Sequence, residues 1–180
     1  MSVLIIDLDD IKSGSCRAQG DVTPGELEID PESLFEFDGP LHLDARISST
    51  DQLSFYVTGK LAYSANGECR RCLKAIRQEV NSVLRGMYAL PEALARLEMS
   101  EEERQEEGIF PLEQNAREID LTSLVREMLV LEYPRYLQCV KDCRGLCPSC
   151  GANLNTESCD CRDESIDLRW SKLLELKKRK

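Results

Sequence analysis

The chain has 180 residues, of which 42% are hydrophobic and 31% are charged, with a formal net charge of −10 and a pI of about 4.7. This composition suits one domain with a small additional module and excludes a globally disordered chain. It also excludes a general nucleic-acid binder with a basic overall field, so any RNA contact must use a local basic patch or a basic partner protein. No stretch approaches the roughly 18 apolar residues that cross a bilayer, and the N-terminus has no basic start, so we expect no signal peptide and a cytoplasmic location.

The first 90 residues are expected to form a β-rich core domain. Three strands are predicted, at residues 41–47, 53–65 and 75–90. These segments either alternate apolar and polar residues or are rich in β-branched and aromatic residues, as strands are. Asn66 and Gly67 are typical of a hairpin turn, and Cys69 and Cys72 follow directly. We therefore predict an α+β protein whose core is an antiparallel β-sheet or small barrel, with this cysteine pair at a hairpin end.

Residues 91–117 differ in character, because eight glutamates there oppose only three arginines. We expect a solvated, mobile acidic linker that is partly helical near Leu94 and Leu97. The alternative interpretation is an acidic tether for a basic partner.

Residues 118–180 are expected to combine a helix with a zinc-binding C-terminal module. The helix is predicted over residues 118–133, with Asp120 or Thr122 as its cap and Pro134 as its end. Its apolar stripe, which we expect to pack on the sheet, is Leu121, Leu124, Val125, Met128 and Leu131. A second short helix is predicted over residues 167–180, with Trp170 on its apolar face and a basic tip at residues 177–180.

The chain has nine cysteines and a single histidine, His42. His42 lies within the first predicted strand, where nothing resembles a catalytic setting, so we interpret it as an ordinary strand residue and expect no enzyme. In a reducing cytoplasm, clustered cysteines favour metal binding over disulfides.

Six cysteines fall within 23 residues, and one pair has the form of a zinc knuckle, Cys147-Pro-Ser-Cys150-Gly151. The two-residue spacing aims both sulfurs at one point, and the glycine can take the positive φ that closes the turn. Zinc binds four such thiolates at about 2.3 Å, usually in closed structural sites. Thiol redox chemistry would favour a dithiol at a helix start within a βαβ pattern, which neither pair shows.

Eight of the cysteines suffice for two four-thiolate zinc sites. The simplest partition by sequence distance is Cys147, Cys150, Cys159 and Cys161 for one site, and Cys69, Cys72, Cys139 and Cys143 for the other. Alternatively, Cys143 replaces Cys159 in the tail site. Cys16 is left over and is expected to be a small buried hydrophobic residue.

Residues 143–155, followed by Cys159-Asp-Cys161, resemble the signature of the YceD family, the large ribosomal RNA subunit accumulation proteins. The upstream pair at residues 67–72, the segment opening at residues 118–121 and the tail from residue 167 are similar to that family too, so the resemblance covers roughly residues 40–180. It implies a predicted metal-binding protein that is needed for accumulation of large-subunit ribosomal RNA, and it supplies no established catalytic activity.

The leading hypothesis is therefore a ribosome-biogenesis factor that acts by binding ribosomal RNA or a large-subunit assembly intermediate, directly or through a basic protein. The candidate nucleic-acid-binding residues flank the first cysteine pair and are Arg70, Arg71, Lys74 and Arg77, and the alternative RNA contact is the basic tip at residues 177–180. The alternatives are an acidic adaptor for a basic ribosomal protein and a thiol redox enzyme. We expect no membrane partner and no small-molecule substrate.

Overall fold

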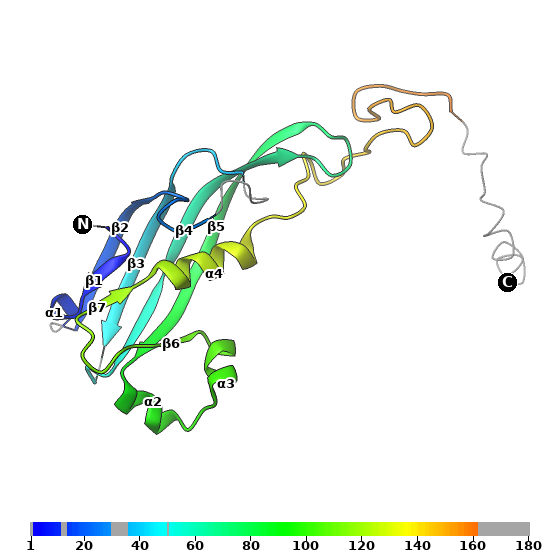
Figure 1. Cartoon of the computed structure of the whole chain (residues 1–180). Coiled ribbons are helices and arrows are strands. Elements are labelled where there is room, and N and C mark those ends of the chain that lie inside the picture. The colour runs from blue at the N-terminus through cyan, green and yellow to red at the C-terminus, as the bar shows by residue number, and fades with distance from the viewer. Residues whose placement is uncertain (1, 12–13, 30–35, 50, 162–180) are drawn as a thin grey trace, which may run out of the picture. The chain divides into compact units, whose positions relative to one another are not determined.

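The structure is a computed structural model that describes residues 2–11, 14–29, 36–49 and 51–161 (Figure 1). The chain divides into two units. Unit 1 comprises Met1–Gly67 and Arg77–Arg135, and unit 2 comprises Glu68–Ile76 and Tyr136–Lys180. This division differs from the three consecutive segments expected from the sequence, because the helix expected with the C-terminal module belongs to unit 1 and the first cysteine pair belongs to unit 2. The predicted helix over residues 167–180 lies outside the described residues.

The main sheet has five strands in the order β2-β3-β4-β5-β6. These strands are β2 (Ser15–Val22), β3 (Leu41–Ser49), β4 (Ser54–Glu68), β5 (Ala75–Ala89) and β6 (Ile109–Pro111). Strand β3 runs antiparallel to both β2 and β4, whereas the short β6 runs parallel to β5. A second small sheet pairs β1 (Ile5–Asp7) with β7 (Glu118–Asp120) in antiparallel fashion. The predicted α+β class is confirmed, with a mixed rather than purely antiparallel sheet.

The segment predicted as an acidic linker is an ordered part of unit 1. It contains α2 (Pro91–Leu97), α3 (Glu101–Glu106) and β6. Helix α3 opens with a capping box, in which the side chain of Ser100 accepts from the Glu103 N–H and the Glu103 carboxylate accepts from the Ser100 N–H. Phe110 of β6 stacks on Tyr88 of β5 with ring centroids 5.1 Å apart, which fixes the segment to the sheet.

Helix α4 (Thr122–Glu132) begins later than predicted, because residues 118–120 pair with β1 as strand β7. The N-cap is Leu121 rather than either predicted residue, although the N–H of Thr122 donates to Asp120 Oδ1. Leu124, Val125 and Leu129 are buried on the side of α4 that faces the sheet. The prediction for Leu131 is wrong, because its side chain is 77% exposed. The buried stripe continues from Val125 to Leu129, one turn later, and Leu131 lies beside that stripe.

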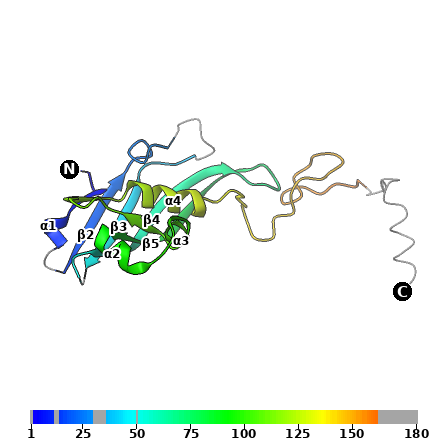
Figure 2. The ribbon, with the colours of Figure 1, turned by 60° about the horizontal axis from the view of Figure 1, so that its bottom comes forward.

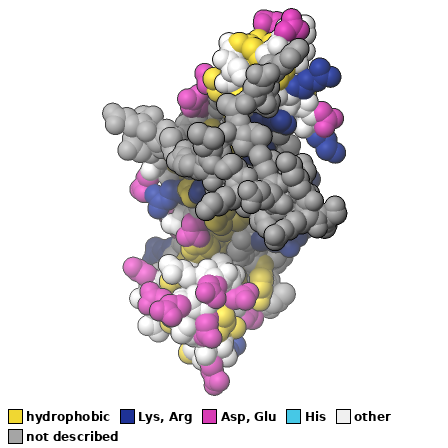
Figure 3. All heavy atoms as spheres, turned by 90° about the vertical axis from the view of Figure 1, so that its right-hand side faces the viewer, with side chains coloured by type: hydrophobic (Ala, Val, Ile, Leu, Met, Phe, Trp, Pro, Cys, Tyr) yellow, Lys and Arg dark blue, Asp and Glu magenta, His cyan; other side chains and the backbone are white. Residues whose placement is uncertain are grey.

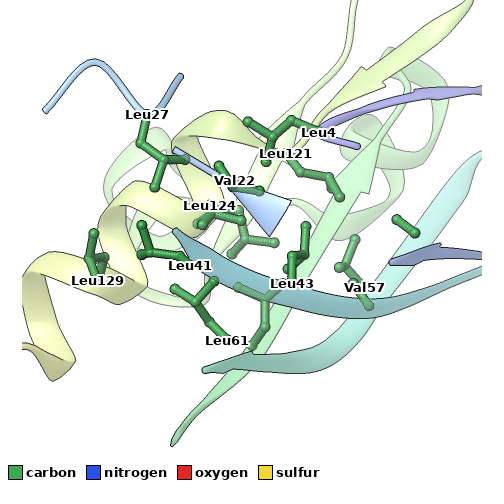
Figure 4. Close-up of a cluster of buried hydrophobic side chains, with 14 of the residues drawn as sticks. Leu4, Val22, Leu27, Leu41, Leu43, Val57, Leu61, Leu121, Leu124 and Leu129 are labelled. Atoms are coloured by element: carbon green, nitrogen blue, oxygen red, sulfur yellow. The ribbon is translucent and has the colours of Figure 1, made fainter. Parts of the chain in front are cut away.

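The core of unit 1 lies between the sheet and α4, which crosses over one face of the strands in both Figure 1 and Figure 2. Strand β3 alternates buried and exposed residues as predicted, and its buried side chains meet those of α4 (Figure 4). The labelled members of this core are Leu4, Val22, Leu27, Leu41, Leu43, Val57, Leu61, Leu121, Leu124 and Leu129. A Cβ on Gly86 would lie 2.8 Å from Leu124 Cδ1, so glycine at this position lets α4 lie directly on β5.

The remaining helix, α1 (Leu8–Ile11), is a single turn that buries Ile11. Cys16 of β2 is half-buried at the margin of the core, which is more exposed than predicted. Within the described part of the chain, no helix is both long enough and apolar enough to cross a membrane.

Candidate metal centres

Unit 2 gathers four cysteine sulfurs from two distant segments of the chain. Cys69 and Cys72 come from the turn between β4 and β5, and Cys139 and Cys143 come from the segment after α4. All four sulfurs lie within 4.8 Å of one another. The Sγ atoms of Cys69 and Cys143 are 3.8 Å apart, and those of Cys72 and Cys139 are 3.6 Å apart.

These sulfur separations discriminate between a disulfide and a metal site. A disulfide bond is about 2.05 Å long. Four thiolates around zinc at about 2.3 Å have sulfur atoms about 3.8 Å apart, which follows from tetrahedral geometry. All the cysteines are free thiols, and the spacing in this group is that of shared metal ligands. The group could hold a metal ion.

A second group consists of Cys147, Cys150, Cys159 and Cys161, whose sulfurs also lie within 4.8 Å of one another. It is more exposed than the first group: only Cys147 is buried, whereas Cys150 and Cys161 are exposed. This group could hold a second metal ion. The structure places Cys143 in the first group, so it brings together the two sets of the simplest partition and not the alternative set.

The turn at the first cysteine pair begins two residues later than Asn66 and Gly67 suggested, because β4 continues to Glu68. The N–H of Cys69 donates to the Lys74 carbonyl at 2.8 Å, and the N–H of Leu73 donates to the Cys69 carbonyl at 2.9 Å. Leu73 closes this turn with a φ of 58°, a conformation that glycine adopts more easily. The requirement to bring two sulfurs together therefore decides where the hairpin turns.

The turn at Cys147 repeats this backbone pattern. The N–H of Cys147 donates to the Ala152 carbonyl at 2.8 Å, and the N–H of Gly151 donates to the Cys147 carbonyl at 2.9 Å. Gly151 has a φ of 77° and occupies the position that Leu73 holds in the first turn. Each group thus contains one knuckle-type turn, and the positive φ predicted for Gly151 is confirmed.

Asn155 supports the first group, although the sequence analysis did not single it out. Its Nδ2 donates to Cys143 Sγ at 3.3 Å, and its Oδ1 accepts from the Arg144 N–H at 2.8 Å. A side chain that both donates to a ligand sulfur and holds the adjacent backbone fixes the orientation of that sulfur. The only signal in the sequence was an asparagine within the cysteine-rich run, where turn residues are common.

Backbone N–H groups favour the thiolate form at one cysteine of each knuckle. Those of Cys139 and Arg71 lower the pKa of Cys69 to about 6. Those of Cys150 and Ser149 lower the pKa of Cys147 to about 6. Donors aimed at sulfur stabilise its anionic form, which is the form that binds a metal.

Two of the four thiols in each group resist ionisation, Cys72 and Cys139 in the first group and Cys159 and Cys161 in the second, because their pKa values are raised. Burial, followed by the neighbouring Cys143 thiol, raises the pKa of Cys139 to about 12. The Cys150 thiol, followed by burial, raises the pKa of Cys161 to about 12. Four adjacent thiols cannot all carry a negative charge unless a cation neutralises them, so this chemistry fits a bound divalent ion in each group.

Three of the four candidate RNA-binding residues lie at the first knuckle. Arg70, Arg71 and Lys74 are exposed there. The guanidinium of Arg70 lies over the ring of Tyr136, 5.8 Å from its centroid, and the Tyr136 side chain is 74% exposed. Tyr136 was missed by sequence reasoning because a lone tyrosine after a proline carries no specific signal.

The fourth candidate, Arg77, lies in unit 1. It forms ion pairs with Asp38 at 2.6 Å and Glu79 at 3.3 Å, so its charge is compensated locally. His42 lies exposed on β3 beside Asp21 of β2, in keeping with an ordinary strand residue.

Comparison with known proteins gives a family match over most of the chain. The profile described as large ribosomal RNA subunit accumulation protein YceD matches residues 57–177, a range that contains both cysteine groups. An uncharacterized protein of Mycobacterium tuberculosis is 35% identical over 136 residues, which cover 76% of this chain and 61% of that protein. An uncharacterized protein of Mycobacterium leprae is 28% identical over 143 residues, which cover 79% of this chain and 62% of that protein.

A shorter match connects the chain to plant proteins. A protein of Arabidopsis thaliana named large ribosomal RNA subunit accumulation protein YCED homolog 1, chloroplastic, is 39% identical over 64 residues, which cover 36% of this chain and 19% of that protein. The chain thus spans about 61% of the length of the Mycobacterium tuberculosis protein and much less of the plant protein. No solved structure matches the chain. Because the profile match covers more than half of the chain, and the two cysteine groups fall within it, the chain belongs to the YceD family.

Proposed function

We propose that this protein supports the accumulation of large-subunit ribosomal RNA by binding, with one zinc ion in each four-cysteine group. The observation that carries the proposal is the family match, whose range contains both groups. Four cysteines fill the four positions that zinc prefers and leave none open for a water or substrate, which favours a structural role. The clustered free thiols suit a reducing compartment such as the cytoplasm.

The distribution of charge supports contact with RNA through unit 2. Unit 1 contains 11 lysines and arginines against 25 aspartates and glutamates, a net charge of −14. Unit 2 contains 12 against 8, a net charge of +4, of which +3 belongs to residues 162–180, outside the described part of the chain, and +1 to residues 68–76 and 136–161. Charges further away than about 10 Å are largely screened at physiological salt, so a polyanion is attracted to the local charge and not to the overall one.

The first knuckle offers RNA both charge and an aromatic surface. Arg70 and Arg71 lie between two cysteines whose sulfurs are turned toward the metal group, so a rigid turn carries both side chains. Guanidinium groups bind phosphate through paired donors, and the exposed Tyr136 ring beside Arg70 can stack with a base. We propose ribosomal RNA, or an assembly intermediate of the large subunit, as the direct partner.

The test is to replace Arg70 and Arg71 with alanine in cells that lack the original copy. We expect the ratio of large- to small-subunit ribosomal RNA to fall, while zinc content stays unchanged. The matched control replaces two exposed arginines of unit 1, Arg96 and Arg117, with alanine and should leave the ratio normal. A normal ratio in the Arg70/Arg71 variant would contradict RNA contact at the knuckle. Crosslinking in cells followed by sequencing would identify the bound RNA.

A second candidate function is docking on a basic ribosomal protein through the acidic helices α2 and α3. Acidic side chains gather in the lower part of Figure 3, at the height where α2 and α3 lie in Figure 1. Opposite charges accelerate encounter between proteins. Binding of a purified basic ribosomal protein in the absence of RNA, lost on replacing Glu102 and Glu106 with glutamine, would favour this function.

A further inference from the structure

The five-stranded sheet of unit 1 presents one face that the rest of the described chain does not cover. The buried residues of β3 and β4 point toward α4, β1 and β7, which all contribute to the same core. The alternate residues of these strands point the other way. On this open face Tyr56 of β4 is 46% exposed and Val83 of β5 is 51% exposed, within the described residues.

The open face carries a different charge from the rest of unit 1. Of the 11 lysines and arginines of this unit, five occupy its outward strand positions, whereas only three of its 25 aspartates and glutamates do. The basic residues are Arg17, Arg46, Lys60, Arg77 and Arg85, and the acidic residues are Asp21, Asp44 and Glu79. A strongly acidic unit thus concentrates its positive charge on one surface.

The pairing of these charges leaves part of the positive charge uncompensated. Arg17 engages both carboxylate oxygens of Asp44, at 2.8 and 2.7 Å. Arg46 lies directly opposite Arg17 on the neighbouring strand, and like charges in that position repel. Among the described residues, no carboxylate forms an ion pair with Arg46 or Arg85.

Arg46, Lys60 and Arg85 line one hollow of about 580 Å³ on this face, over Gly59, and the Arg17–Asp44 pair lines it too, with Asp44 opposite Lys60. Tyr56 lies on the same strand and the same face as Lys60, four residues away. Positive side chains that follow a backbone, together with an exposed aromatic ring, are the elements with which proteins bind single-stranded nucleic acids on sheets.

We infer that the open face of the sheet is a second RNA-binding surface, on which Arg46, Lys60 and Arg85 bind phosphates of a single strand and Tyr56 stacks with a base. This inference rests on the proposed function, since it takes RNA as the partner. The anion relieves the repulsion between Arg46 and Arg17, and the surface of a sheet suits unpaired bases rather than a duplex groove.

The experiment measures binding of a fluorescent oligouridylate of about 12 nucleotides to the full-length, zinc-loaded protein, at salt concentrations from about 50 to about 200 mM. The variant is Arg46→Glu with Arg85→Glu. The control, Arg96→Glu with Arg117→Glu, makes the same change in net charge away from the face. We expect the variant to bind at least about tenfold more weakly, with a salt slope smaller by about 1 to 2. The control should stay within about twofold of the original protein.

Two further arms make the result decisive. Tyr56→Ala should weaken binding several-fold and Tyr56→Phe should retain it, since stacking needs the ring and not the hydroxyl. An Arg46→Gln, Arg85→Gln variant replaces the glutamate variant if thermal unfolding shows that the latter is not folded. Equal losses in variant and control, or equally tight binding of poly-glutamate, would overturn the inference.

The surface at the first knuckle is assayed in parallel with Arg70→Ala and Arg71→Ala. Loss of RNA binding there, with normal binding by the sheet-face variant, overturns this inference and leaves the proposed function intact. Unchanged binding in both variants would contradict RNA contact at either surface, whereas loss in the sheet-face variant supports the inference.

Discussion

The two units of this protein have interiors of different chemistry. Unit 1 buries aliphatic and aromatic side chains between a sheet and a helix. In the described part of unit 2, by contrast, the buried side chains are four cysteines and Leu137. One leucine cannot offset the conformational entropy lost when such a segment is ordered, so metal–thiolate bonds must supply the stabilisation. One chain thus combines a domain that burial stabilises with a module that depends on coordination.

Removing zinc should have the largest effect, and it should affect the two units differently. Each structural zinc contributes on the order of 10 kcal/mol to the folding of its site, far more than the few apolar contacts of unit 2. We expect a strong chelator to unfold unit 2 and leave unit 1 folded. In an amide NMR spectrum, signals from residues 136–161 should lose dispersion while those from β3 and α4 persist.

The chelation experiment also tests whether unit 1 is independent. If its signals collapse together with those of unit 2, the contrast between the two interiors does not correspond to separate folding units. Re-addition of zinc should restore the original spectrum, which separates reversible metal loss from oxidation of the thiols.

Pairwise cysteine substitutions test which sulfurs share a metal. Cys69→Ser with Cys143→Ser removes two ligands from one group, so we expect one of the two zinc equivalents to remain. Cys69→Ser with Cys159→Ser removes one ligand from each group, so we expect both equivalents to be lost or strongly weakened. Elemental analysis of the purified variants measures the difference.

The alternative partition, in which Cys143 replaces Cys159, predicts the reverse outcome. The variant at Cys69 and Cys143 would then lose both zinc equivalents, and the variant at Cys69 and Cys159 would keep one. The matched control is Cys16→Ser in unit 1, which should keep both zinc equivalents because Cys16 belongs to neither group. Loss of zinc in that control would show that serine substitution acts through misfolding.

A smaller effect, confined to unit 1, should follow from changes in α4. Leu129→Ala removes a fully buried side chain and should lower the free energy of unfolding by about 2–5 kcal/mol. Leu131→Ala removes an exposed side chain from the same helix and should change it by less than about 0.5 kcal/mol. Urea unfolding followed by circular dichroism measures both values, and zinc content should stay constant. Equal costs for the two leucines would show that α4 packs differently.

Local sequence patterns predicted the features that depend on neighbouring residues. Alternation identified β3, and the accumulation of β-branched and aromatic residues identified β4 and β5. The spacing of Cys147, Cys150 and Gly151 predicted a knuckle because two residues between the cysteines suffice to form the turn. The α+β class followed from the strand and helix patterns, and the family was indicated by the resemblance of residues 143–161 to the YceD signature.

Other features were not predicted from the sequence, because they depend on residues that are distant along the chain. Glutamate density suggested a linker at residues 91–117, yet Phe110 packs on Tyr88 and fixes that segment to the sheet. Helical spacing included Leu131, but whether a leucine at the edge of the stripe is buried depends on where the sheet ends beneath it. Tyr136 and Asn155 gained significance only from Arg70 and Cys143, their neighbours in space.

The sequence by itself determined that eight cysteines suffice for two groups of four and that the first pair lies at a hairpin end. Both conclusions follow from the spacing of the cysteines and from the strand pattern. Only the tertiary structure decided that Cys139 and Cys143 meet Cys69 and Cys72, some 70 residues away. It also decided that the sheet leaves a basic face open. Contacts between distant segments depend on how strands and helices pack, and hydrophobic periodicity specifies which side of an element is buried without specifying what covers it.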